Sequence, residues 1–186
     1  MMTPVGALMI EHRLIERMVH LLEAQVQFAE GGGRIDPDFI DAAVGFIRTY
    51  ADRCHHGKEE EILFRELESR PLEEPYKRVL HELIQEHVQG RQMTARLAEA
   101  NARYRGGDDA AAADIIAVSR ELAEFYPKHI DKEDHHFFVP TMDCFSKKDL
   151  AEMLERFFEF DRQLIHEQYR GVVGQWEAQR PAQWQQ

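Results

Sequence analysis

The stretch 55–59, HHGKE, and its counterpart 129–133, HIDKE, decide the fold of this chain. Each begins with a histidine that has lysine three positions later and glutamate four positions later. A glutamate-histidine pair precedes each stretch. The pair at 11–12 ends 43 positions before the first histidine of HHGKE, and the pair at 86–87 ends 42 positions before that of HIDKE. This agreement predicts one helix pair that is repeated about 75 residues further along the chain.

Two such pairs would form an antiparallel four-helix bundle in which the repeated residues meet at one depth. Because an α-helix advances about 100° per residue, side chains four positions apart lie on one face and can reach one site. Neutral imidazoles and carboxylates suit iron, manganese or zinc, whereas calcium sites are built from oxygen. Two carboxylates that can bridge favour a dinuclear centre. The predicted metal ligands are His12, His55, Glu59, His87, His129 and Glu133.

A competing register exists in the first stretch. His56 and Glu60 have the same four-residue spacing as His55 and Glu59. On a regular α-helix the two pairs are rotated by about 100° from each other, so only one pair can face the centre. Alignment of the two copies matches His129 with His55, and this favours His55 and Glu59 as the ligands.

Apolar residues recur at three- and four-residue spacing through nearly the whole chain, which indicates an all-α protein. Clusters of glycine and proline mark the helix ends, and Asp36 with Pro37 is typical of a capped helix start. The fourth helix contains Pro127, which either kinks it or splits it in two. The predicted helices cover about 4–30, 36–69, 76–104 and, after Asp108, the region up to about 138.

A fifth helix is predicted from about Lys147 to Ala178, because Ser146 and Asp149 form a capping box at its start. Its aromatic residues either pack it on the bundle or form a homodimer interface. The predicted fold is therefore all-α: an up-down-up-down four-helix bundle with an additional C-terminal helix. We assign residues 1–145 to the bundle, 146–180 to the C-terminal helix and 181–186 to a tail.

Composition excludes several classes of partner. The chain has 186 residues, which suits one domain, a formal net charge of -11 and a pI near 5.4. An acidic protein is repelled by nucleic acid and by anionic membranes, so neither is expected as a partner. No run reaches the roughly 20 apolar residues of a membrane span, and no targeting segment is recognisable, so we expect a cytoplasmic protein. The two cysteines, Cys54 and Cys144, form no Cys-x-x-Cys motif and are expected to be reduced.

The predicted ligands on four successive helices resemble those of the hemerythrin-like (HHE cation-binding) family. The resemblance extends from about Ala7 to Pro140 and includes the local sequences EHR at 11–13, HGKEE at 56–60 and EHVQGR at 86–91. It implies an up-down-up-down bundle that holds a non-haem di-iron centre, bridged by the two carboxylates and an oxo or hydroxo group. Zinc and manganese are the expected substitutes for iron.

One feature departs from the oxygen-carrying hemerythrins, which have a His-x-x-x-His pair on the third helix. Here Leu83 and Arg91 stand four positions before and after His87, so one imidazole is missing. The six predicted ligands leave a further position that is open or filled by water or by a side chain. An open position favours reaction with small oxidants over simple oxygen carriage. The candidate side chains are Glu16, Tyr126 and Tyr50.

Outer contacts can also be predicted, because metal-bound imidazoles usually donate their other N–H to a carboxylate or carbonyl. The candidate acceptors are Glu11, Asp52, Glu86, Asp131 and Asp134. Cys54 adjoins a predicted ligand and is expected to be a core residue, because an acidic surrounding does not lower a thiol pKa.

Members of the family variously bind dioxygen, sense oxygen or iron, handle nitric oxide or peroxide, or help repair iron–sulfur clusters. Two functions therefore follow from the resemblance. The leading one is a di-iron protein that binds or reacts with dioxygen, nitric oxide or peroxide, with turnover left open. The alternative is an iron- or oxygen-responsive sensing module in which metal occupancy orders the bundle. A metal-free helical scaffold is the third interpretation.

Overall fold

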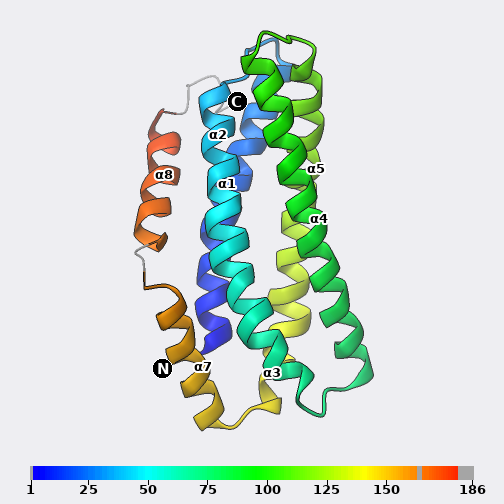
Figure 1. The fold of residues 1–186 in the computed structure, drawn as a ribbon, viewed down its shortest axis with the longest axis vertical. Coiled ribbons are helices and arrows are strands. Elements are labelled where there is room, and N and C mark those ends of the chain that lie inside the picture. The colour runs from blue at the N-terminus through cyan, green and yellow to red at the C-terminus, as the bar shows by residue number, and fades with distance from the viewer. Residues whose placement is uncertain (1, 163–164, 180–186) are drawn as a thin grey trace.

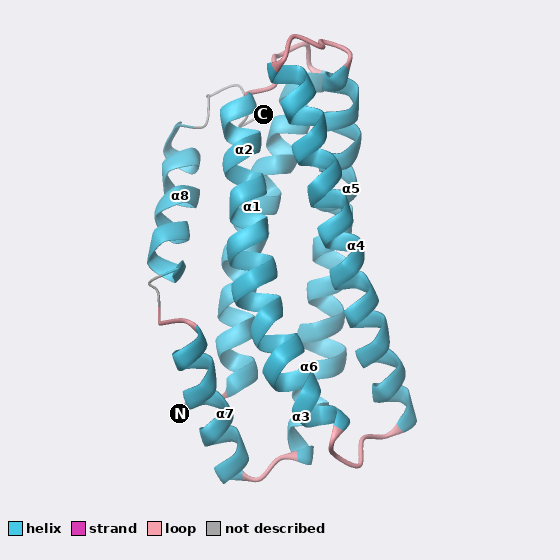
Figure 2. Ribbon diagram, in the orientation of Figure 1, coloured by secondary structure: helices cyan, strands magenta, loops and turns pink. Residues whose placement is uncertain are grey.

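The computed structural model describes residues 2–162 and 165–179, and every regular element in these two ranges is a helix (Figure 2). The predicted tail, 181–186, lies outside the described residues. The helices are, in chain order, α1 (Pro4–Glu30), α2 (Pro37–Phe46), η1 (Ile47–His56), η2 (Glu59–Phe64), α3 (Arg65–Glu68), α4 (Glu74–Arg105), α5 (Ala111–Asp131), η3 (Lys132–Phe137), α6 (Phe138–Thr141), η4 (Met142–Cys144), α7 (Lys147–Phe160) and α8 (Ile165–Gln179).

Four long rods form the bundle, as predicted. The first and third are α1 and α4. The second consists of α2, η1, η2 and α3, which follow one another with helical backbone angles at the junctions, and the fourth consists of α5, η3 and α6. Helix α5 continues through Pro127, so the predicted split does not occur there. The segments η1, η2 and η3 are π-helical, which widens the second and fourth rods locally.

Short connections make neighbouring rods antiparallel. Thr3 caps α1 by accepting a backbone N–H at 3.1 Å, and Asp36 caps α2 in the same way at 2.9 Å. Gly32 and Gly107 turn the chain after α1 and α4 with φ of 91° and 94°, a conformation that glycine adopts without strain. Helix α1 packs against α2 and α5, and α4 packs against the same two helices, which closes the four-rod bundle (Figure 1).

Two apolar cores fill the bundle, and a polar layer separates them. Along each rod the chain passes from one core to the other through the histidines and glutamates of the repeated pattern: on α1, for example, Leu8 lies in one core, His12 in the layer and Leu14 in the other core. The first core includes Leu14, Met18, Phe39, Leu97, Ile115 and Leu122, and the second includes Leu8, Leu63, Leu67, Leu83, Phe137 and Phe157. A fully buried polar layer is costly unless its groups are paired or bind metal.

The C-terminal segment packs along one flank of the bundle, where α7 contacts α1 and η2 while α8 contacts α1, α2 and η1 (Figure 1). The capping box of Ser146 and Asp149 is confirmed, with its two hydrogen bonds at 2.9 and 3.2 Å. The prediction of one continuous fifth helix is wrong, because α7 ends at Phe160 and α8 begins at Ile165.

The break has a physical reason. Phe157 of α7 belongs to the second core, whereas Val173 of α8 belongs to the first. At the end of α7 the carboxylate of Asp161 accepts hydrogen bonds from Lys58 and Cys54 of the second rod, and the helix stops there. Trp176 packs edge-on against Phe39 of α2, with 5.2 Å between the ring centres. Part of the aromatic face of the C-terminal segment therefore packs on the bundle, as predicted. The homodimer stays a prediction.

Within residues 2–162 and 165–179, no helix combines the length and the apolar character needed to span a lipid bilayer.

Candidate metal centre

All six predicted ligands are buried in the polar layer, and they belong to two groups of close donor atoms found among the described residues. In each group the donor atoms lie within 4.8 Å of one another. We call them the first group and the second group. The first group is His12, His55, Glu59 and Glu133, and the second group is His56, His87 and His129.

The two carboxylates lie between the two sets of imidazoles. Glu59 has Oε1 at 3.3 Å from His55 Nε2 and Oε2 at 3.4 Å from His87 Nε2. Glu133 has Oε2 at 3.2 Å from His12 Nε2 and at 3.4 Å from His129 Nε2. Each carboxylate thus faces at least one histidine of each group.

The donor atoms of this layer fit a metal. Both oxygens of Glu59 and of Glu133, and the Nε2 atoms of His87 and His129, are buried without a hydrogen-bond partner in the described part of the chain. The Nε2 atoms of His12 and His55 face each other at 2.9 Å. Buried polar atoms are normally hydrogen bonded, so a convergent set without partners points to an ion that these atoms surround.

The structure corrects the predicted orientation of His56. The sequence predicts that its side chain faces away from the centre, but it belongs to the second group. It is buried, and its ring stacks on that of His87 with 3.9 Å between the ring centres. The prediction assumed a regular α-helix, but His55 and His56 end the π-helical η1, in which each residue rotates less than the 100° of an α-helix. Both adjacent imidazoles can therefore face the layer. His56 thus brings a third imidazole to the second group.

We expect His56→Phe to weaken metal binding by more than about 10-fold, because phenylalanine keeps the stack on His87 but has no donor atom. His136→Ala, on an exposed residue of the fourth rod, should leave binding unchanged. Titration of the metal-free protein with a divalent metal measures both variants. If His56→Phe binds as much metal as the wild type and as tightly, His56 is not a ligand.

Four of the five imidazoles are also held from behind by a hydrogen bond to a carboxylate. The Nδ1–H of His12 donates to Asp134 at 2.7 Å, and that of His55 donates to Glu11 at 2.8 Å. The same contact joins His87 to Glu60 at 2.7 Å and His129 to Glu86 at 2.8 Å, while Nδ1 of His56 lies 3.2 Å from Asp52. Such contacts fix the ring orientation and direct Nε2 at the metal. The predicted acceptors Glu11, Glu86 and Asp134 are confirmed. Asp52 lies near His56 but accepts no hydrogen bond from it, Asp131 pairs with His135 instead, and Glu60 was not predicted.

Each lysine of the repeated pattern donates to a carboxylate that holds a histidine of the layer. Lys58 donates to Glu11, the carboxylate behind His55. Lys132 donates to Glu86 at 2.5 Å, the carboxylate behind His129. Each half of the chain therefore builds the same connection, from a lysine through a glutamate of the neighbouring rod to a histidine on the lysine's own rod. The lysine at the fourth position of each stretch supports the histidine that begins that stretch.

Carboxylates dominate the electrostatics of the layer in the absence of metal. Burial by itself would lower the pKa of His12, but the hydrogen bond to Asp134 and the carboxylate of Glu133 raise this pKa to about 10. The carboxylates of Glu133 and Glu60 likewise outweigh burial and raise the pKa of His87 to about 10. Burial and the charge of His87 hold the pKa of His56 well below its usual value. Metal binding must therefore displace protons from His12 and His87.

The other predicted side chains lie outside the two groups. Glu16 pairs with Arg13 at 3.1 Å. Tyr126 is buried, and its hydroxyl faces Gly90 without a hydrogen-bond partner in the described chain. Tyr50 is buried in the first core. Cys54 is also buried, and burial raises the pKa of its thiol, as expected for a core residue.

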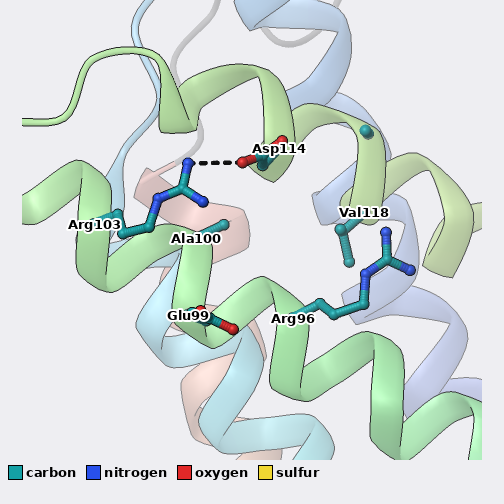
Figure 3. Close-up of a pocket in the computed structure, with 7 residues that line it drawn as sticks. Arg96, Glu99, Ala100, Arg103, Asp114 and Val118 are labelled. Atoms are coloured by element: carbon teal, nitrogen blue, oxygen red, sulfur yellow. Dashed lines mark hydrogen bonds and ion pairs between the residues drawn. The ribbon is translucent and has the colours of Figure 1, made fainter.

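Two surface hollows differ in their relation to the centre. A pocket of about 620 Å³ includes Asp52 and Glu60, the carboxylates behind His56 and His87, and so adjoins the second group. The pocket in Figure 3 lies between α4 and α5, and its Arg103 pairs with Asp114 at 2.7 Å. It begins at Arg96, nine residues or roughly 14 Å along α4 from His87, so it is no part of the centre.

The comparisons agree with this geometry. The family model described as the hemerythrin HHE cation binding domain matches residues 3–139. Searches among the curated proteins and among the solved structures found no similar chain. The match includes every residue of both groups and all of the four rods except the last two residues of α6, and it ends before α7. The chain therefore belongs to the hemerythrin HHE cation-binding domain family.

Proposed function

We propose that this protein holds a non-haem di-iron centre that binds or reacts with dioxygen, nitric oxide or peroxide. The observation that carries the proposal is the position of Glu59 and Glu133, each between an imidazole of the first group and one of the second group. A site for one ion has no need of two carboxylates that each face both sets of histidines.

The number of donors favours iron or manganese over zinc. The first group offers two imidazoles and two carboxylate oxygens, and the second offers three imidazoles beside the same two carboxylates. Protein zinc sites usually have four ligands in a tetrahedron, whereas five donors suit a larger coordination number. The group with fewer donors, that of His12 and His55, leaves more room for a small ligand.

Apolar rings shield the layer from water. Phe138 stacks on His12 and Phe64 on His87, each with 5.9 Å between ring centres, and Phe125 stacks on His129 at 5.5 Å. Together with the outer carboxylates, these rings hold the imidazoles in place and limit access to small molecules. A reduced di-iron pair would supply the electrons for a bound oxidant.

Elemental analysis of the purified protein tests the proposal, together with its absorption spectrum before and after dithionite and after air exposure. We expect about two irons per chain, and a near-ultraviolet ligand-to-iron band that disappears on reduction and returns in air. Metal-dependent consumption of peroxide or nitric oxide is the next assay. Less than stoichiometric metal after anaerobic reconstitution with iron would overturn the proposal and favour the metal-free scaffold.

The alternative function is an iron- or oxygen-responsive sensing module. It is supported by the position of the polar layer between the two apolar cores and by the central donor atoms of this layer that have no hydrogen-bond partner in the described chain. Metal occupancy would therefore order the middle of the bundle. Limited proteolysis of metal-free and loaded protein tests this. A large gain in resistance on loading, without consumption of any oxidant, would favour the sensing function over the reactive one.

A further inference from the structure

The C-terminal segment reaches the support of the metal centre through one residue. Asp161 follows the last residue of α7, and its Oδ2 accepts a hydrogen bond from Lys58 Nζ at 2.6 Å. Its Oδ1 accepts one from Cys54 Sγ at 2.8 Å. Both donors come from the second rod, on either side of His55 and His56. Asp161 lies beyond residue 139, where the family match ends.

The contact continues inward to a ligand of the first group. Lys58 donates to Glu11 as well as to Asp161, and Glu11 accepts the Nδ1–H of His55 at 2.8 Å. Three successive contacts therefore join the end of α7 to the imidazole of His55. All of these side chains are buried or half-buried, so little water is present to replace a lost contact.

The repeat supplies an internal comparison. Lys132 in the second copy makes the same contact with Glu86, but its other partner is Glu82 on α4. Lys132 is 28% exposed and Glu82 is 58% exposed, whereas Lys58 is 0% exposed because α7 covers it. Burying an ammonium group is costly unless it is paired, so the ammonium of Lys58 needs both Glu11 and Asp161 as partners. The ammonium of Lys132 is partly exposed and can also be solvated by water.

We propose that Asp161 is a positioning residue for the metal centre, which acts on His55 through Lys58 and Glu11 and couples the docking of α7 to metal binding. The inference rests on the proposed function in so far as the first group binds a metal. Without the carboxylate of Asp161, the Lys58 ammonium keeps one buried acceptor and shifts, and Glu11 no longer holds His55 in one orientation. The coupling is reciprocal, so metal loading must also strengthen the docking of α7.

The variant test compares Asp161→Asn with Glu82→Gln, its counterpart in the second copy. We expect iron to pass to a chelator about 10-fold faster from Asp161→Asn than from the wild type, the lower end of the effect of losing a direct partner of a ligand, because Asp161 acts through Lys58 and Glu11. Glu82→Gln should change this rate by less than about 3-fold, because Lys132 is solvated. Asp161→Asn should also shift the ligand-to-iron band, which a loss of helix packing alone would not do, and Asp161→Glu should restore it in part.

A second measurement uses the wild-type chain and does not depend on how a variant folds. Amide hydrogen exchange is followed over residues 147–160 in the metal-free and the iron-loaded protein. We expect slower exchange in α7 after loading, because the ordered His55 fixes Glu11, Lys58 and Asp161 in turn. Unchanged exchange in α7, or equal iron release from Asp161→Asn and Glu82→Gln, would overturn the coupling. A wild type that takes up no iron would overturn the proposed function instead.

Discussion

Replacing Glu133 with glutamine is expected to remove metal from both positions and to lower the affinity of the centre by more than about 100-fold, beyond the loss of an outer contact. Glu133 is the side chain that faces most of the imidazoles. Its Oε2 lies 3.2 Å from His12 and 3.4 Å from His129, and its Oε1 lies 3.6 Å from His87. Glutamine has nearly the same shape, but it is neutral and offers one oxygen in place of two.

The control for this variant is His135→Gln, two positions further along the same rod. His135 is 66% exposed and pairs with Asp131, so its loss should leave metal content unchanged. Elemental analysis after iron reconstitution measures both proteins, and circular dichroism verifies that both are helical. Glu59→Gln should behave like Glu133→Gln, because Glu59 also lies between the two groups. If either variant retains two tightly bound irons, the carboxylates do not bridge.

The two-copy pattern was sufficient to predict the bundle and six of the seven residues in the two groups. Spacing carries this information, because a match of 43 and 42 positions between histidines brings both halves to one depth only if the helices are antiparallel. The caps at Asp36 and Ser146 were also predictable, since a side-chain oxygen before a helix has one obvious role. These features depend on local chemistry or on a long repeat.

His56 was not predictable from periodicity. A spacing of three and four residues indicates a helix but does not distinguish i to i+4 hydrogen bonding from the i to i+5 pattern of η1. The signal in the sequence is that two histidines are adjacent in this rod. Ala51 and Ile62, which precede and follow them in the same rod, are apolar and buried. The role of Glu60 is not predictable from spacing either, because the acceptor behind His87 comes from another rod and the four-residue spacing relates Glu60 only to His56.

The break between α7 and α8 is not predictable from the local sequence, because it depends on tertiary structure. No proline or glycine occurs at 161–164 to end a helix. Helix α7 ends at Phe160, where the carboxylate of the next residue, Asp161, accepts hydrogen bonds from Lys58 and Cys54 of the second rod. A helix can be interrupted by contacts from the rest of the fold, which no local pattern in 147–178 records.

Metal-free protein is expected to lose stability as the pH rises from about 6.5 to about 10, whereas the metal-loaded protein is not. The pKa values of His12 and His87 are about 10 in the folded metal-free protein, against 6.5 for ordinary histidine. Below pH 6.5 both states hold these protons, so the stabilisation is complete. Above it the unfolded chain loses them first, and the free energy of unfolding falls until the folded histidines also lose theirs.

The expected loss is several kcal/mol, because a difference of one unit in pKa is worth about 1.4 kcal/mol and both histidines contribute. In the loaded protein the metal holds both imidazoles neutral, so neither titrates over this range. For the same reason, loading at neutral pH should release at least the two protons of His12 and His87, which calorimetry in buffers of different ionisation enthalpy detects. Denaturant unfolding at about pH 6.5 and pH 9.5 measures the stability of both forms. His12→Gln should reduce the slope in the metal-free protein and His135→Gln should not. A metal-free protein whose stability stays level or rises with pH would show that the carboxylates do not hold His12 and His87 protonated.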